Sequence, residues 1–175
     1  SLRASLRTVM GQFPVTEEYV QKFSAGAASL FSAHIMNALM EIGYADSLYG
    51  DLYHQILSSS GSCYVPRPYP DVREAAKLIR VAGGISVLAH PSVYDSIELM
   101  RELAQEGLID GIERYHPHLK EEDAAEIDAV LEEYDLISTG GTDFHGANSQ
   151  HPNPLGTCLT TQDSLERIFK LAKSK

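Results

Sequence analysis

The sequence predicts an α/β protein in which a parallel sheet occupies the second half of the chain and a mostly helical region precedes it. After residue 70, apolar residues at helical spacing alternate with short apolar runs of strand length. This alternation is typical of βα units, whose strands pair in parallel. Two of the apolar runs are followed by His or Asp, and functional groups of α/β folds collect at that end of their strands.

The first part of the chain, residues 1–69, has helical patterns and no strand pattern. Thr16 is placed to cap one short helix, and Ser32 a second one that ends at Gly43. Asp46 is placed to cap a third helix, because Ser, Thr and Asp side chains accept hydrogen bonds from the first free amides of a helix. We therefore expect a helical insertion or linker region here.

The second part, residues 70–175, is expected to hold alternating helices and strands. Gly83 and Gly84 predict a helix stop, and Pro91 predicts the end of the following strand, since proline cannot donate a ladder hydrogen bond. The expected elements are helices centred near Ala76, Leu103, Val130 and Phe169, strands at 85–89, 111–115 and 136–139, and a fourth strand at 157–159.

Composition and charge exclude several classes of protein. The 175 residues are 43% hydrophobic and 22% charged, and 14 basic against 24 acidic residues give a net charge of −10. This balance argues against a nucleic-acid surface, which needs a basic face, but it allows a small anionic substrate bound beside a metal. Much of the acid lies in 121–133, where it predicts the first turn and solvated face of a helix.

Cysteine content and hydropathy predict a cytoplasmic protein without a membrane span. Cys63 and Cys158 are too few for a disulfide framework and lack metal-type spacing, so we expect reduced thiols. No apolar run approaches the roughly 18 residues of a membrane helix. The N-terminus has no starting Met and no long apolar segment, which indicates a truncated or processed chain and not a signal peptide.

Candidate metal ligands stand at two strand ends. Asp143 and His145 follow the apolar run 136–139 at i, i+2, so that both reach one centre while Phe144 points into the core. A carboxylate and an imidazole suit Zn, Mn or Fe. His90 follows the strand 85–89 in the same way. The alternatives are an Asx-type turn beside a surface His for the first pair, and a structural His that caps a strand for His90.

Three segments of the chain carry a family resemblance. Ala-Gly-Gly-Ile-Ser-Val-Leu-Ala-His-Pro (82–91), Asp-Gly-Ile-Glu-Arg-Tyr-His-Pro-His (110–118) and Thr-Gly-Gly-Thr-Asp-Phe-His-Gly (139–146) resemble consecutive motifs of the PHP (polymerase and histidinol phosphatase) superfamily. The nearest branch is its stand-alone nucleotide phosphoesterases, and Ser32-Ala33-His34 resembles part of the helical insertion of that branch. The resemblance extends over about residues 25–160, so it covers most of the chain.

The resemblance implies a distorted seven-stranded β/α barrel, of which this chain is the C-terminal portion, with two or three divalent metals at the carboxyl ends of the strands. It implies metal-ligand roles for His90, Asp143 and His145, with Asp143 also orienting the attacking water. It places His34 near the substrate phosphate, and His116 and His118 where the family has polar groups at the mouth of the site. The guanidinium that binds phosphate in the family is absent beside His34, and Arg67 or Arg114 is the candidate to replace it.

The chain also departs from the family pattern. The opening His-x-His, the Thr-Asp-His segment and the bridging Glu of the family are absent, and the usual Arg-Pro-His is Ser32-Ala33-His34. We therefore expect the C-terminal part of a longer enzyme, with the first barrel strands missing. Such a fragment should bind metal weakly or not at all and should be inactive alone, because a lasting site needs its full ligand set.

The predicted function of the parent is metal-dependent hydrolysis of a phosphate ester, of a nucleotide or nucleoside bisphosphate, by a metal-activated water. Two alternatives remain open, a non-catalytic interaction module derived from a degenerate barrel and an amidohydrolase-type metal hydrolase. An opened barrel exposes strand edges, so we also expect a homo-oligomer through those edges, or their coverage by the N-terminal helices.

Overall fold

The computed structural model describes residues 2–66, 68–144 and 153–174, which fall into two compact units. The first unit runs up to Tyr69, and the second comprises Pro70–Phe144 and the described residues from Asn153 on. Each unit has its own buried hydrophobic core. Within the described ranges, no helix combines the length and the apolar character that a membrane crossing requires.

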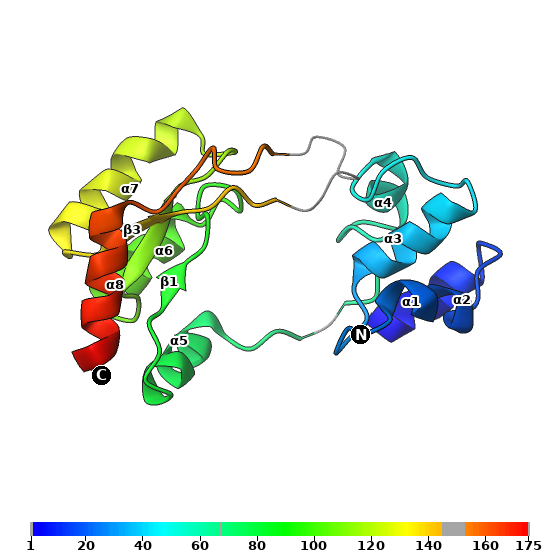
Figure 1. The fold of residues 1–175 in the computed structure, drawn as a ribbon, viewed down its shortest axis with the longest axis horizontal. Helices are drawn as coiled ribbons and strands as arrows, with labels where there is room; N and C mark the ends of the chain where they lie inside the picture. Colours follow the sequence, from blue (N-terminus) through cyan, green and yellow to red (C-terminus); the bar gives the residue numbers. More distant parts are fainter. Residues whose placement is uncertain (1, 67, 145–152, 175) are drawn as a thin grey trace. The chain divides into compact units, whose positions relative to one another are not determined.

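Helices are the regular elements of the first unit in the part that the structure describes. Its elements are α1 (Leu2–Met10), α2 (Glu17–Gln21), the short 3₁₀ helix η1 (Lys22–Ser24), α3 (Ser32–Glu41) and α4 (Asp51–Ile56) (Figure 1). They surround a core whose fully buried side chains are mainly aliphatic, including Leu6, Val9, Val20, Ile35, Met36 and Leu39.

Helix starts in this unit follow the predictions only in part. Thr16 caps α2 as predicted, since its side chain accepts a hydrogen bond from the Tyr19 amide at 3.1 Å. The prediction that Ser32 caps α3 is wrong, because Phe31 is the N-cap residue and its amide donates to Nδ1 of His34 at 3.0 Å. The cap at Asp46 is also wrong, because Gly50 precedes the first residue of α4.

Helix α1 is an element for which no prediction was made. Leu2, Leu6 and Val9 have helical spacing, and the last two are buried in the core. Ser5 is buried on the same helix, and its hydroxyl accepts a hydrogen bond from the Val65 amide at 3.1 Å. Helix α1 thus contributes to the core of the first unit, and its Ser5 holds the segment around Val65 by a hydrogen bond.

The second unit contains a three-stranded parallel sheet in the order β1-β2-β3, which confirms the predicted α/β class (Figure 1). Its elements are α5 (Val72–Val81), β1 (Val87–Leu88), α6 (Ile97–Gln105), β2 (Gly111–Tyr115), α7 (Glu121–Glu133), β3 (Ile137–Gly140) and α8 (Gln162–Ser174). The core side chains come mainly from α6, α7 and β2, with Met100, Leu103, Ile112, Ile127 and Val130 fully buried.

Strand β1 is shorter than the predicted strand 85–89. Val87 pairs with Gly111 and Leu88 with Ile112, and the ladder ends there. The His90 amide bonds to the Glu113 side chain at 3.0 Å and not to a strand carbonyl. His90 also has a φ of 28°, which is outside the range of extended chain, so the strand cannot continue through it.

The predicted fourth strand at 157–159 is wrong. The Thr160 side chain bonds to the end of β3 where a fourth strand would form backbone hydrogen bonds. Oγ1 of Thr160 accepts from the Gly140 amide at 3.0 Å and donates to the Gly140 carbonyl at 3.1 Å. A Cβ on Gly140 would lie 2.7 Å from the Leu159 carbonyl oxygen, so glycine permits this close approach. The segment therefore lies beside the end of β3 without pairing as a strand.

The predicted helix stop at Gly83 and Gly84 is confirmed. The Gly83 amide donates to the Arg80 carbonyl at 3.0 Å, and the Gly84 amide donates to that of Ile79 at 2.8 Å. Gly83 has a φ of 74°. This is the Schellman arrangement, in which a glycine in the left-handed region satisfies the last carbonyls of a helix.

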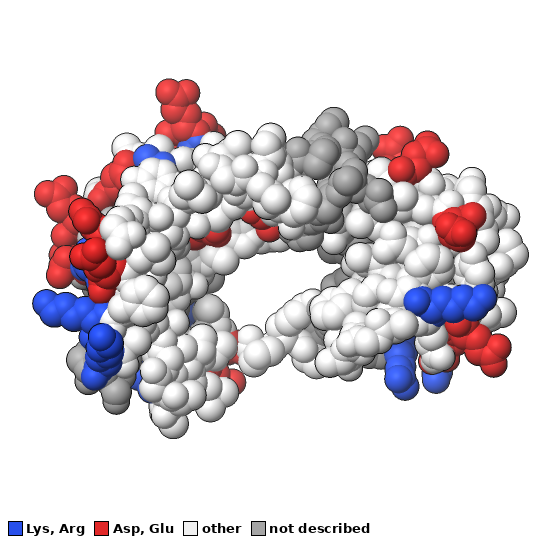
Figure 2. Space-filling view, viewed as in Figure 1, with Lys and Arg blue, Asp and Glu red and all other residues white. Residues whose placement is uncertain are grey.

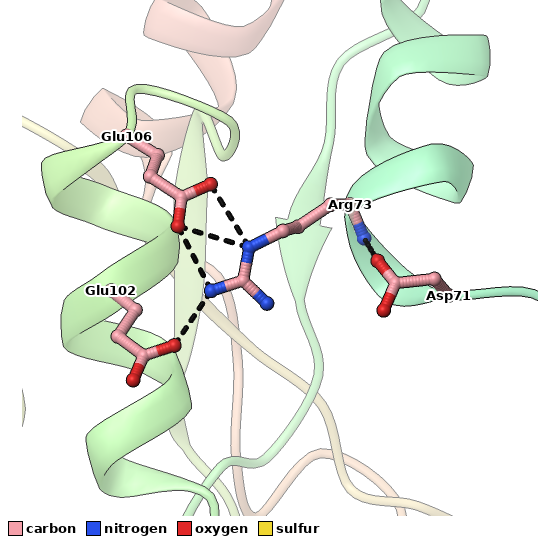
Figure 3. Close-up of polar contacts among 4 residues, drawn as sticks. All are labelled: Asp71, Arg73, Glu102 and Glu106. Carbon is pink, nitrogen blue, oxygen red and sulfur yellow. Dashed lines mark hydrogen bonds and ion pairs between the residues drawn. The ribbon is translucent and has the colours of Figure 1, made fainter.

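Arg73 joins the first turn of α5 to the last turn of α6 (Figure 3). Its Nε donates to both carboxylate oxygens of Glu106 at 2.9 and 3.0 Å, and its Nη2 donates to Glu102 at 2.6 Å. These hydrogen bonds raise the pKa of Arg73 and lower that of Glu106. Arg80, in the last turn of α5, adds a hydrogen bond to the Gly107 carbonyl. Both ends of α5 are therefore bonded to the C-terminal end of α6 or to the residues that follow it.

The acidic run 121–133 forms α7, as predicted, with Glu121, Glu122 and Asp123 in its first turn. Asp and Glu side chains gather on the side of the second unit that carries this helix (Figure 2). One of its carboxylates faces the sheet, since Asp128 accepts from Nε and Nη2 of Arg114 at 2.6 and 2.9 Å. This pair lowers the pKa of Asp128 and raises that of Arg114.

Ile112 is expected to be a main contributor to the stability of the second unit, because it is fully buried on the central strand. Ile112→Ala should lower the free energy of opening by roughly 2–5 kcal/mol, read from hydrogen exchange at the β2 amides. Leu78→Ala on α5 is the control, because Leu78 is 68% exposed and should change exchange little. Equal effects of the two variants would contradict this core assignment.

The Arg114–Asp128 pair predicts a pH-dependent stability difference. A depressed carboxyl pKa stabilises the fold above the unfolded-state pKa, and the stabilisation is lost as pH falls through the folded-state pKa. Asp128→Asn should therefore unfold at lower urea concentration than wild type at pH 7. The difference should begin to shrink as the pH falls below about 4 and should disappear only below the depressed pKa of folded Asp128. Glu132→Gln, on an exposed part of α7, should match wild type throughout. A difference that does not shrink at all as the pH is lowered from 7 to 3 would refute the pairing.

Candidate metal and phosphate site

Three side chains from three successive strand ends meet in the second unit. His90 follows β1, His116 follows β2 and Asp143 follows β3, and one ligand atom from each lies within 4.8 Å of the others. Nε2 of His116 is 3.6 Å from Oδ2 of Asp143, and the rings of His90 and His116 are 4.9 Å apart. Because the strands are parallel, their carboxyl ends bring these residues to the same edge of the sheet.

His90 is held in a sparsely populated backbone conformation by its neighbours. Its φ is 28°, its amide donates to Oε2 of Glu113, and its carbonyl accepts from the Val93 amide at 3.0 Å. The buried Ser92 anchors the same loop, because its hydroxyl donates to Asp123 at 2.7 Å and accepts from the Lys120 amide at 3.0 Å. The beginning of α7 therefore fixes the turn that presents His90.

Asp143 lies in a second turn, and its own φ of 52° is in the left-handed region. The Gly141 amide donates to the Tyr115 carbonyl at 3.0 Å, and the Thr142 hydroxyl accepts from the Gly156 amide at 3.2 Å. The Asp143 side chain is 40% exposed. Phe144 is 46% exposed, so the prediction that it points into the core is wrong. The glycine-flanked segment turns at Asp143, and the alternation of an extended strand does not apply there.

The His116 side chain is only 2% exposed, and a backbone hydrogen bond indicates which of its ring nitrogens carries the proton. Its Nδ1 accepts a hydrogen bond from the His118 amide at 3.1 Å. A neutral imidazole carries one proton, which must therefore be on Nε2, the nitrogen nearest Asp143. Burial lowers the pKa of His116, and the negative charge of Glu113 opposes this effect. Nε2 of His116 is thus a hydrogen-bond donor that points into the cluster.

The buried nitrogens of the cluster fit a bound group. Nδ1 of His90 and Nε2 of His116 are buried and have no aligned hydrogen-bond partner among the described residues. Oε2 of Glu113 lies 3.3 Å from Nδ1 of His90. A carboxylate beside Nδ1 favours a proton there, which leaves Nε2 of His90 free as a metal ligand. By composition, two imidazoles and a carboxylate form a group that could bind a divalent metal, and the proton on Nε2 of His116 leaves His90 and Asp143 as its lone-pair donors.

The other predicted site residues lie outside this cluster or outside the described residues. His34 lies on α3 of the first unit, where its Nδ1 accepts the Phe31 amide. His118 is exposed, with its ring 5.6 Å from that of His116. Arg114 is bound to Asp128 through two of its nitrogens. Arg67 and His145 lie outside the described residues, so the predictions that concern them remain predictions.

Glu113 is a site residue that the sequence analysis did not select. Its side chain is 19% exposed, and it contacts both the amide and the ring of His90. The signal was present in the strand pattern, since Ile112 faces the core and the next side chain along a strand points to the opposite face. An acidic residue at that position of a mostly buried strand is a candidate for the site.

Comparisons with known proteins bear on the same residues. No protein-family model matches the chain. It is 33% identical over 147 residues to a phosphoribosyl 1,2-cyclic phosphate 1,2-diphosphodiesterase of Eggerthella lenta, covering 84% of this chain and 56% of the relative. It is 27% identical over 172 residues to the 5′-3′ exoribonuclease Rnm of Escherichia coli, covering 94% of this chain and 56% of that protein.

A solved structure resembles the whole fold. A protein of Bifidobacterium adolescentis assigned as a metal-dependent phosphoesterase superimposes with a TM-score of 0.84 at 26% identity, covering 96% of this chain and 60% of its own. The chain therefore spans a little more than half the length of the proteins that it matches. It is a homologue of PHP-type phosphoesterases over most of its own length, which confirms the family resemblance of its three motifs.

Proposed function

We propose that the protein to which this chain belongs hydrolyses a phosphate ester in a metal-dependent reaction, at the site formed by His90, His116 and Asp143. The observation that carries the proposal is the convergence of these side chains, within 4.8 Å, at the carboxyl ends of three parallel strands. The names of the relatives and of the structural neighbour support phosphoester chemistry.

We assign the metal-binding role to His90, Asp143 and His145. Nε2 of His90 is the available ligand atom because Glu113 lies beside Nδ1, and Asp143 offers a carboxylate oxygen. Divalent Mn, Zn or Fe suits this donor set, and two or three ions in the full-length protein would supply an activated water and a Lewis acid for the phosphoryl group. Asp143 is also placed to orient the attacking water.

His116 has a different role in this proposal. A metal ligand must present a lone pair, whereas the His118 amide leaves Nε2 of His116 protonated. His116 therefore donates a hydrogen bond to a phosphate oxygen as a neutral imidazole, and it does not need to be protonated first. His118, exposed beside it, is assigned to the mouth of the same site.

We propose that residues 1–69 form a helical insertion that contributes to substrate binding, and that 70–175 are the last βα units of a barrel. His34 is the candidate from the insertion, because the Phe31 amide at its Nδ1 leaves Nε2 as a donor, as in His116. Arg67 is proposed as the guanidinium that binds phosphate, because Arg114 is engaged by Asp128.

The proposed substrate is a small phosphorylated molecule of the nucleotide type. The two curated relatives are named for a phosphoribosyl cyclic phosphate and for RNA, which share a ribose phosphodiester. The net charge of −10 disfavours a long nucleic-acid contact, so a nucleotide or nucleoside bisphosphate fits this chain better. The remaining metal ligands are proposed to come from other strands of the longer protein.

The activity test uses a protein of the relatives' full length, with Mn²⁺ and nucleoside 3′,5′-bisphosphates, a ribose cyclic phosphate and a short 5′-phosphorylated RNA as substrates. His90→Ala and Asp143→Asn should each lower kcat/KM by at least about 10²-fold, because each removes a ligand of a catalytic metal. His54→Ala, on the exposed face of α4, is the control. Wild-type activity in both site variants would overturn the site assignment.

A second test separates the role of His116 from that of His90. His116→Ala should lower kcat by about 10²-fold while the Mn²⁺ affinity measured by calorimetry stays within a factor of two. His90→Ala should instead lower the Mn²⁺ affinity. If His116→Ala abolished Mn²⁺ binding, His116 would be a metal ligand, and the proton assignment from the His118 amide would be wrong.

A further inference from the structure

We infer that Glu113 is the positioning residue of the site, a single carboxylate that sets the geometry of both the His90 turn and the Asp143 turn. The inference deepens the proposed function, on which it rests for its effect on metal binding. Glu113 lies on β2, the central strand, between the strands that lead to His90 and to Asp143. From this position one side chain reaches the loops on both sides.

The first contact is with the backbone of His90. Oε2 of Glu113 accepts the His90 amide at 3.0 Å, at the point where β1 leaves the sheet with a φ of 28°. A non-glycine residue held in a sparsely populated region costs on the order of 1–3 kcal/mol, so it persists only where its surroundings impose it. The carboxylate supplies an acceptor for an amide that has lost its strand partner, and it thereby stabilises the turn.

The second contact is with the ring of the same residue. Oε2 of Glu113 is 3.3 Å from Nδ1 of His90, and both side chains are about four-fifths buried, with 22% of His90 and 19% of Glu113 exposed. A carboxylate at this distance favours the tautomer with the proton on Nδ1. One oxygen atom therefore restrains both the backbone and the proton position of His90, and it leaves Nε2 as the lone-pair donor.

The third contact is with the turn that carries Asp143. A Cβ on Gly141 would lie 2.6 Å from Oε1 of Glu113, and the next nearest atom within 4 Å is Cδ of the same side chain, at 3.9 Å. Gly141 has no positive φ, so its backbone conformation does not require glycine. The missing side chain instead leaves the space that the carboxylate occupies, two residues before Asp143.

Glu113 acts on the cluster without belonging to it. Within the described part of the chain, the group of atoms close enough to share an ion consists of His90, His116 and Asp143. The carboxylate instead uses one oxygen on the turn after β1 and places the other against the turn after β3. Its role is therefore to fix the spacing and proton positions of the ligands, and not to contact the reacting atoms.

The test compares Glu113→Gln, Glu113→Ala and Gly141→Ala in the 175-residue chain. The glutamine keeps an acceptor for the His90 amide but removes the charge beside Nδ1, and the added methyl group at Gly141 displaces the carboxylate without removing it. Three quantities are measured: the ¹⁵N chemical shifts of the His90 ring in the metal-free protein, hydrogen exchange across residues 88–93, and Mn²⁺ affinity by calorimetry.

In wild type, the ¹⁵N shifts should identify the Nδ1–H tautomer of His90. Glu113→Gln and Gly141→Ala should both move His90 toward a mixture of tautomers while His116 keeps its proton on Nε2. Glu113→Ala should in addition raise exchange across 88–93 by about tenfold or more. Where wild type binds Mn²⁺, each variant should weaken binding by about 10–100-fold, the usual effect of losing a partner of a ligating histidine.

The double variant at Glu113 and Gly141 gives the most decisive measurement, because it shows whether the effects of the two substitutions are coupled. Once Glu113 is alanine, the methyl group of Gly141→Ala has no carboxylate to displace, so the double variant should match Glu113→Ala alone. Gly11→Ala is the matched control, because its Cβ would meet its nearest atom at an ordinary 3.4 Å and its φ is not positive.

Unchanged His90 shifts and unchanged exchange in all three variants would overturn the inference, and so would additive effects in the double variant. Failure of the proposed function gives a different result. If wild type neither binds Mn²⁺ nor, at full length, hydrolyses a phosphoester, the tautomer and exchange measurements in the metal-free chain still decide whether Glu113 positions His90.

Discussion

The parallel pairing of β2 with both of its neighbours is the constraint on which the rest of the second unit depends. It fixes the register of Val87 with Gly111 and of Gly111 with Ile137, so all three strands end at the same edge. The register between β2 and β3 shifts between Glu113 and Tyr115, beside the site, where such irregularities commonly redirect side chains. Ile112 faces the helices and Glu113 faces the cluster, so one strand serves both stability and chemistry.

The site is assembled at a cost in backbone energy. His90 and Asp143 both have positive φ values, although neither is glycine. The cost is offset by bonds from other elements: Ser92 is tied to the beginning of α7, Thr142 to the Gly156 amide, and the His90 amide to β2. Asp95 and Asp135 also have positive φ values, so this conformation alone does not mark the site. His90 and Asp143 differ from them in that their side chains meet in the cluster with His116.

The sequence was sufficient for most of the regular elements, although not for α1, and for part of the site. Gly83-Gly84, Thr16 and the period of 72–81 predicted local structure well, because capping and amphipathic spacing are short-range effects. Some failures are local, as at the predicted caps Ser32 and Asp46 and at the turn of Asp143, and others involve partners distant in sequence. The Thr160 side chain replaces a strand at 157–159, and the segment turns at Asp143 before Phe144 can reach the core. Glu113 acquires its role only when β1 and β3 are placed on either side of it, which no local pattern shows.

The hydrogen bonds between Thr160 and Gly140 restrict which edge of the sheet can pair with a further strand. Both the amide and the carbonyl of the last residue of β3 are occupied by one hydroxyl, so a strand that approached this edge would have to displace them before pairing. A single side chain thus protects an edge that would otherwise template further strands. Within the described part of the chain, β1 pairs only with β2, so its other edge is the one where a neighbouring strand can be added without displacing such a hydroxyl.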